Sequence, residues 1–230
     1  MRQIVLDTET TGLDHKSGHR IIEIACLEMV NRKITGSHLH LYINPEREVE
    51  QEAQSIHGIT NEFLQDKPLF KDISESFLEY VKDAELIIHN APFDLGFINM
   101  EFSRVNKRLG RLEEYCQITD SLKIARQLQR GQRNSLDALC KRYGVDNSHR
   151  EFHGALLDAE LLAKVYLLMT GGQGTLFGEE ISHQEEVRTQ DQNIQVEFVQ
   201  GSLPVIYANE AELAAHAEKL KALKIEESAW

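Results

Sequence analysis

A short apolar run near the N-terminus, which ends in two carboxylates, constrains this chain more than any other feature. Ile4-Val5-Leu6 is apolar and largely β-branched, which predicts a short buried strand, and Asp7-Thr8-Glu9-Thr10-Thr11-Gly12 follows it. Because side chains alternate along a strand, we expect Asp7 and Glu9 to share one face at its tip. Two carboxylates this close repel each other, so either their pKa rises or a hard cation such as Mg²⁺ or Mn²⁺ binds between them. For the isolated pair, two solvated acids at an ordinary strand end are an equal alternative.

The apolar pattern further along predicts an α/β fold with a mixed sheet flanked by helices. Residues 20–30 and the alternating residues 34–43 predict two strands that continue the first one as an antiparallel meander. Helical spacing of apolar residues over 73–81, followed by an apolar strand over 85–89, predicts a parallel crossover. The other predicted elements are helices over 49–54, 60–64, 92–102, 121–128, 135–143 and 153–169 and a weak strand over 118–121.

Two histidines on the third predicted strand could share a metal ion. His38 and His40 lie on one face of that strand, but no third ligand lies nearby in the sequence. We therefore interpret them as residues on the solvent side, with a metal site as the less favoured alternative.

Length and composition indicate a cytoplasmic protein that forms either one large domain or one domain plus a tail. The chain has 230 residues, of which 41% are hydrophobic, and this suffices for a real core. It has no apolar run of membrane-spanning length, and its start at Met-Arg-Gln-Ile lacks the pattern of a signal peptide. Its three cysteines are widely spaced without a Cys-x-x-Cys motif, which argues against disulfides, zinc and redox chemistry.

The net charge of −12 is unevenly distributed. Residues 178–230 hold 11 acids and 4 bases, which leaves −5 on residues 1–177, where several acids are candidate metal ligands. This balance fits an enzyme that holds a few nucleotides through metal ions better than a protein that coats long duplexes with a basic face.

Three further residues could complete a metal site with Asp7 and Glu9. Asp94 falls in the first turn of a helix, just past a predicted strand tip. Asp158 lies on the mostly buried face of the last long helix, where a carboxylate needs a partner, and His153 precedes it by five residues. Four carboxylates can hold two divalent cations, and a histidine beside them can act as the general base for phosphodiester hydrolysis. Taken alone, His153 is better explained as a helix cap.

Three motifs in this chain match those of a known family in order and spacing. They are Asp7-Thr8-Glu9-Thr10-Thr11-Gly12, His89-Asn90-Ala91-Pro92-Phe93-Asp94 and His153-Gly154-Ala155-Leu156-Leu157-Asp158-Ala159. These resemble the three exonuclease motifs of the DEDD 3′→5′ exonucleases, and the His-x-x-x-x-Asp form is typical of the histidine subclass (DEDDh). Within that subclass the chain looks most like the proofreading (epsilon) subunits of bacterial DNA polymerase III, over residues 1 to about 170.

The resemblance implies a ribonuclease H-like exonuclease fold, two Mg²⁺ or Mn²⁺ ions per site and release of nucleoside 5′-monophosphates from single-stranded DNA 3′ ends. It implies that His153 is the catalytic base. The metal ligands that it implies are Asp7, Glu9, Asp94 and Asp158.

The same resemblance nominates residues that bind the substrate. Residues 52–60 match the family segment that contacts the terminal nucleotide, which points to Glu52 and His57. On the local sequence alone, His57 is equally well explained as a loop histidine that satisfies backbone groups. Three of the implied ligands would also face the substrate, namely Asp7, Glu9 and Asp158.

After residue 172 the chain changes in character. Gln173-Gly174-Thr175-Leu176-Phe177 resembles the short motif by which bacterial replication proteins bind the sliding clamp (beta), although Leu176 and Phe177 could instead pack back on the domain. We predict an exonuclease domain over 1–172, a clamp motif and flexible linker over 173–195 and a polymerase-binding segment over 196–230. The expected partners are single-stranded DNA 3′ ends, the catalytic (alpha) subunit of DNA polymerase III, the sliding clamp and a small theta-like subunit.

Two other functions fit part of the pattern. A related 3′→5′ exoribonuclease or oligoribonuclease would share every catalytic residue, but it has no obvious use for a linker and the segment over 196–230. A non-enzymatic adaptor with the same fold would not need five groups that repel or titrate unless a metal is bound. A proofreading exonuclease is therefore the favoured interpretation.

Overall fold

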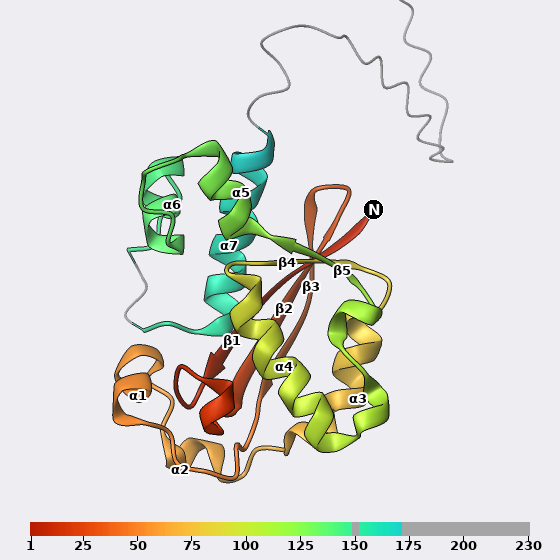
Figure 1. Ribbon diagram of the computed structural model, residues 1–230. Helices are drawn as coiled ribbons and strands as arrows, with labels where there is room; N and C mark the ends of the chain where they lie inside the picture. The colour runs from red at the N-terminus through yellow and green to blue at the C-terminus, as the bar shows by residue number, and fades with distance from the viewer. Residues whose placement is uncertain (149–151, 172–230) are drawn as a thin grey trace, which may run out of the picture. The chain divides into compact units, whose positions relative to one another are not determined.

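The computed structural model describes residues 1–148 and 152–171, which form a mixed five-stranded sheet between two layers of helices (Figure 1). The strand order is β3-β2-β1-β4-β5. The strands are β1 (Arg2–Thr10), β2 (Ile21–Val30), β3 (Lys33–Tyr42), β4 (Glu85–Ile88) and β5 (Gln117–Asp120). β1, β2 and β3 are antiparallel neighbours, whereas β4 is parallel to β1 and β5 is parallel to β4. The predicted meander and parallel crossover are confirmed.

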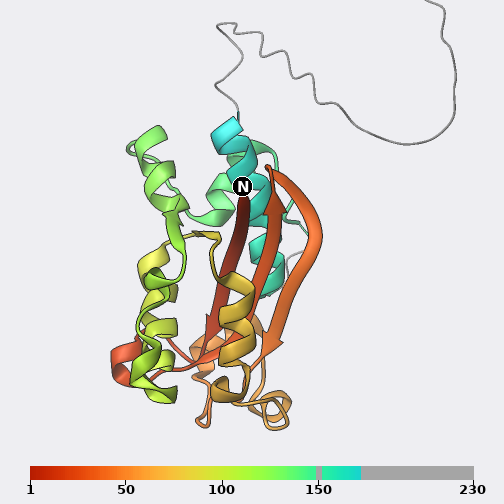
Figure 2. The same ribbon diagram turned by 90° about the vertical axis from the view of Figure 1, so that its right-hand side faces the viewer.

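Helices in the described part of the chain cover both faces of this sheet (Figures 1 and 2). The α-helices are α1 (Gln51–His57), α2 (Asn61–Leu64), α3 (Phe70–Val81), α4 (Ala91–Val105), α5 (Ser121–Leu128), α6 (Leu136–Tyr143) and α7 (Ala155–Gly171). Short 3-10 turns lie at η1 (His15–Ser17), η2 (Lys107–Leu109) and η3 (Leu112–Glu114).

Alternation along β1 divides the core between the two faces. Ile4 and Leu6 are fully buried against residues of α3 and α4, such as Phe77 and Phe97. Val5 is fully buried in the second core, which α7 supplies with a series of apolar side chains. Burial of one such side chain stabilises a fold by about 1.5–3 kcal/mol, so β1 is held firmly from both sides. The residues after it inherit the same alternation, which places Asp7 and Glu9 toward α7 and Thr8 toward α4.

Residues that end or begin elements explain why the chain turns where it does. The hydroxyls of Thr60 and Ser135 accept hydrogen bonds from the amides of Phe63 (3.2 Å) and Ala138 (3.4 Å) and so cap α2 and α6. Pro92 occupies the first turn of α4, where its missing N–H costs nothing.

β1 ends at Thr10 and carries both carboxylates near its tip, as expected. Two helix boundaries near the site differ from the predicted ones. α1 extends through His57 because Gly58 adopts the left-handed conformation (φ 72°) that ends a helix one residue later. α7 begins at Ala155, so His153 precedes the helix.

None of the helices in the described ranges combines the length and apolar character needed to cross a membrane. Cys26, Cys116 and Cys140 form no disulfide within the described residues. The predicted segments 173–195 and 196–230, with Gln173, Leu176 and Phe177, lie outside the described residues.

Candidate functional site

Asp7 and Glu9 lie near the end of β1, on the sheet face that α7 covers. Burial raises the pKa of Asp7 well above its ordinary value, and repulsion from neighbouring carboxylates raises it further. In order of effect, these neighbours are Asp94, Glu9, Asp158 and Glu23. The fold therefore holds Asp7 where its ionised form is unfavourable unless positive charge is added.

Asp94 reaches the same point from the other face of the sheet. It lies in the first turn of α4, which starts three residues after β4 ends, and only 3% of it is exposed. Thr8 Oγ1 donates a hydrogen bond of 2.7 Å to Asp94 Oδ1. Burial raises the pKa of Asp94 to about 7, although the hydrogen bond from Thr8 acts to lower it. A buried acid with a pKa this far from its ordinary value is typical of a functional site.

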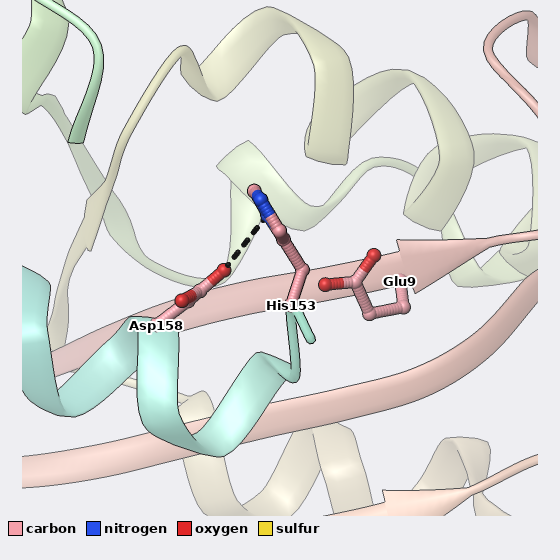
Figure 3. A group of neighbouring side chains, drawn as sticks. All are labelled: Glu9, His153 and Asp158. Carbon is pink, nitrogen blue, oxygen red and sulfur yellow. Dashed lines mark ion pairs between the residues drawn. The ribbon is translucent and has the colours of Figure 1, made fainter. Parts of the chain in front are cut away.

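Asp158 and His153 come from the start of α7. Asp158 is 4% exposed, whereas His153 is exposed just before the helix. His153 Nδ1 lies 3.5 Å from Asp158 Oδ2 (Figure 3). The amide of His153 donates a hydrogen bond of 3.0 Å to the carbonyl of Ile56, which ties this loop to α1. One ligand atom each from Glu9, His153 and Asp158 lies within 4.8 Å of the other two, and Figure 3 shows the Glu9 carboxylate beside the pair.

The structure thus brings together the five residues that the sequence nominated for a metal site, from β1, α4 and α7. We name this group the acidic cluster: Asp7, Glu9, Asp94, His153 and Asp158. Carboxylate oxygens are the ligands that hard divalent cations prefer. Burial raises the pKa of both Asp7 and Asp94, so positive charge bound beside them would favour their ionised forms. The donor set therefore fits a divalent metal centre.

A pocket of about 290 Å³ adjoins the acidic cluster and is lined by β1 and α1. Glu52 and His57 both line it, together with the apolar Leu13, Ile56 and Phe93. His57 Nδ1 accepts a hydrogen bond of 3.0 Å from the amide of Ile59, which leaves the proton of the neutral ring on Nε2. That N–H is directed at the backbone of Thr10 without forming a well-aligned hydrogen bond. Burial lowers the pKa of His57, so the ring is neutral at pH 7.

Sequence reasoning missed Glu23, a buried carboxylate on β2. Glu23 is 2% exposed and pairs across the sheet with Glu9. Its Oε2 accepts a hydrogen bond of 3.1 Å from the amide of Ala155, the first residue of α7, and its Oε1 lies 2.6 Å from His40 Nε2. Glu23 therefore fixes the start of the helix that carries Asp158. A lone acid inside the apolar run of residues 21–27 was the signal that could have revealed it.

The same contact corrects the interpretation of one histidine. His38 is exposed, as expected for a solvent-side residue. His40 is instead half-buried and bound to Glu23, because a buried carboxylate on β2 needs a hydrogen-bonding partner from the adjacent strand.

Comparison with known proteins matches residues 4–166 of this chain to the family described as Exonuclease (RNase_T). DNA polymerase III subunit epsilon of Salmonella typhimurium is 49% identical over 227 residues, which cover 95% of this chain and 92% of that protein. The protein of the same name from Escherichia coli is 48% identical over 227 residues, with the same coverage. The one from Rickettsia prowazekii is 55% identical over 177 residues, which are 77% of each chain.

Solved structures share the same fold. Exonuclease X in complex with 5′ overhanging duplex DNA superposes with a TM-score of 0.60 and 25% identity, over 75% of this chain and 93% of that one. Exonuclease I (apo) gives a TM-score of 0.63 with 17% identity, over 75% of this chain and 42% of that one. The ribonuclease H-like exonuclease fold is therefore confirmed. The chain belongs to the exonuclease family and, within it, to the epsilon subunits of DNA polymerase III, which are metal-dependent 3′→5′ proofreading exonucleases.

Proposed function

We propose that the acidic cluster holds two divalent ions, Mg²⁺ or Mn²⁺, and that the chain uses them to hydrolyse the last phosphodiester bond of a DNA 3′ end. The proposed ligands are Asp7, Glu9, Asp94 and Asp158. The observation that carries this proposal is that four carboxylates from three distant chain segments converge, although burial opposes the ionisation of Asp7 and Asp94 and the neighbouring carboxylates further oppose that of Asp7. When bound, such ions lower the pKa of a water molecule and balance the charge that builds up on the scissile phosphate.

His153 is proposed to accept the proton of the attacking water. It is exposed to the solvent from which that water comes, and it lies next to Asp158. Its backbone bond to Ile56 holds the loop in place, so the ring needs little rearrangement to reach a substrate. A base in this position contributes on the order of 10²–10⁴-fold to the rate.

The pocket beside the cluster is proposed to hold the 3′-terminal nucleotide. Leu13, Ile56 and Phe93 offer apolar surface for a base or sugar. His57 Nε2–H offers a donor to a sugar oxygen, and Glu52 offers an acceptor. Of the proposed ligands, three also face the scissile phosphate in this arrangement, namely Asp7, Glu9 and Asp158.

The proposed partners follow from the relatives, whose name makes them subunits of DNA polymerase III. The similarity to the Salmonella protein extends over 95% of this chain and so is not confined to the exonuclease domain. We therefore propose that residues 196–230 bind the catalytic (alpha) subunit and that Gln173, Leu176 and Phe177 bind the sliding clamp. A short tether over 173–195 would raise the local concentration of the exonuclease at the primer end without new catalytic contacts. A small theta-like subunit is a further proposed partner.

One assay tests the proposed reaction. The full chain with Mg²⁺ is mixed with end-labelled single-stranded DNA and RNA, and the DNA is also offered in duplexes with a matched or a mismatched 3′ end. We expect stepwise shortening from the 3′ end, with DNA preferred to RNA and mismatched ends preferred to matched ones, because a frayed end enters the pocket more readily. A preference for RNA would instead support the oligoribonuclease alternative.

A truncation tests the proposed docking. A chain that ends after Thr170 keeps every residue of the acidic cluster and should digest single-stranded DNA normally, but it should not co-purify with the polymerase. Leu176→Ala with Phe177→Ala should weaken only clamp binding. If the truncated chain binds the polymerase as tightly as the full chain, the tail is not the docking element.

A further inference from the structure

We name the pocket of about 290 Å³ lined by β1 and α1 the apolar pocket. A second, larger cavity includes His89, which directly follows β4, and its lining differs in charge. Its volume is about 610 Å³, and Arg126, Arg130 and His89 line it without any carboxylate. The apolar pocket, in contrast, is lined by three carboxylates, those of Glu9, Glu50 and Glu52. We name the larger cavity the arginine cavity.

The two cavities are lined by residues at the ends of neighbouring strands. Glu9 of β1 lines the apolar pocket, and His89 lines the arginine cavity. His89 follows the last residue of β4, Ile88, whose Cα partner on β1 is Leu6, the residue before Asp7. The cavity wall therefore starts one strand away from Asp7, at the same end of the sheet.

The hydrogen bonds that hold the loop between α5 and α6 do not involve the arginines that line the cavity. His89 Nε2 lies 2.9 Å from the carbonyl of Asn134, and Asn134 Nδ2 donates to the carbonyls of Gln129 (3.3 Å) and Gln132 (3.1 Å). Arg142 donates to Asn134 Oδ1 at 3.0 Å. Within the described part of the chain, Arg126 and Arg130 are exposed and take no part in these bonds, so both guanidinium groups are available for a ligand.

The charge around this loop is opposite to that of the whole chain. Residues 121–136 contain four bases and no acid, on a chain whose net charge is −12. A DNA strand with its terminal nucleotide in the apolar pocket must leave the acidic cluster in some direction. The carboxylates that line the apolar pocket repel its backbone, whereas the guanidinium groups of Arg126 and Arg130 attract it.

We propose that Arg126 and Arg130 bind the backbone phosphates on the 5′ side of the scissile bond, which makes the arginine cavity the entry subsite for the strand. Exposed guanidinium groups bind phosphate oxygens with geometric preference and without reading the base, as an exonuclease that acts on any sequence requires. His89 is then a positioning residue that keeps the loop next to α4. This inference rests on the proposed reaction at the acidic cluster.

The experiment compares substrates with and without upstream phosphates. A deoxydinucleoside monophosphate carries only the scissile phosphate, whereas an oligonucleotide of about ten nucleotides carries enough upstream phosphates to fill the cavity. The full chain, Arg126→Ala/Arg130→Ala and the matched control Arg104→Ala/Arg108→Ala are assayed on both with Mg²⁺. The control removes the same charge from exposed arginines at the far end of α4 and in η2.

We expect Arg126→Ala/Arg130→Ala to lower the ratio of kcat/KM on the oligonucleotide to kcat/KM on the dinucleotide by about tenfold, the product of two exposed ion pairs worth about threefold each. The slope of log KM against log salt on the oligonucleotide should fall by about 0.7 for each phosphate that the variant no longer neutralises. Arg126→Lys/Arg130→Lys should recover most of the salt slope. The control should keep the wild-type ratio and slope.

Three results would overturn the proposal: an unchanged ratio in Arg126→Ala/Arg130→Ala, an equal loss in the control, or an equal loss on both substrates. A wild-type chain that cleaves neither substrate contradicts the proposed reaction itself. A normal wild-type profile with an unchanged ratio in the variant contradicts only the entry subsite.

Discussion

Replacing Asp94 by asparagine should stabilise the metal-free protein, because the fold holds this carboxylate where its charge is unfavourable. Burial raises the pKa of Asp94 from an ordinary 3.8 to about 7. Each pKa unit corresponds to about 1.36 kcal/mol, so ionising Asp94 costs the folded state about 4 kcal/mol above about pH 7. Asparagine is of the same size, carries no charge and keeps an oxygen to accept the hydrogen bond from Thr8.

The effect has a defined dependence on pH. Below about pH 4 the carboxyl group is protonated in both the folded and the unfolded chain, so the variant gains nothing. As pH rises from about 4 to about 7, the unfolded chain releases the proton before the folded chain does, and the stability of the wild type falls. The advantage of Asp94→Asn should therefore grow across this window and reach its full value near pH 8.

Urea denaturation in the presence of EDTA measures this difference, with Asp66→Asn as a control at an exposed acid. With saturating Mg²⁺ the order should reverse, because Mg²⁺ that binds only the folded state stabilises the wild type, whereas the variant lacks one of the proposed metal-binding carboxylates. If Asp94→Asn is no more stable than the wild type near pH 8 without metal, then burial does not penalise this charge and the electrostatic case for a cation site is wrong.

Three further substitutions test other parts of the structure. Glu101→Ala should lower the free energy of unfolding by about 3–5 kcal/mol, because it leaves buried Arg20 without the carboxylate that it contacts at 2.6 and 2.8 Å. The rate of hydrolysis of the dinucleoside monophosphate should not change. A loss of activity as large as the loss of stability would contradict a purely structural role. Glu23→Ala should lower the free energy of unfolding, measured by urea denaturation, by about 1.5–3 kcal/mol and should also lower kcat. Glu23→Gln keeps an acceptor for the amide at the start of α7, so it should retain most of the stability and most of kcat. Equal behaviour of the two variants would refute the anchoring role. His57→Phe keeps a buried ring but removes Nε2–H, so KM for single-stranded DNA should rise by about 2- to 10-fold with a smaller change in kcat, and an unchanged KM would exclude contact with the substrate.

The part of the site that follows strand geometry could be predicted from the sequence. Asp7 and Glu9 share a face because the side-chain period of a strand is two, and Asp94 follows a strand parallel to theirs, so both strands end at the same edge. Asp158 was expected near them because a carboxylate on a buried helix face needs a partner. The proximity of these residues could be inferred from the local sequence pattern and the chain topology alone.

The part that depends on tertiary contacts could not be predicted. Glu23 and His40 meet across two strands, and Glu23 also receives the amide of Ala155, which is far away in the sequence. The extent of α1 was missed because a helix can run up to the residue before a glycine, as it does here at His57 and Gly58. The arginine cavity was missed because overall net charge conceals a local run of bases.

We propose that the carboxylates of the acidic cluster bind the metal while His153 moves the proton, and Mn²⁺ binding measured together with hydrolysis tests these roles most directly. The same preparations of wild type, His153→Ala and Asp158→Ala are titrated with Mn²⁺ by calorimetry and assayed on single-stranded DNA. We expect His153→Ala to keep the wild-type Mn²⁺ stoichiometry and affinity while losing on the order of 10²–10⁴-fold in rate, and Asp158→Ala to lose both. If His153→Ala loses Mn²⁺ as Asp158→Ala does, the histidine is a ligand, and if Asp158→Ala keeps both properties, the metal centre is not at the acidic cluster.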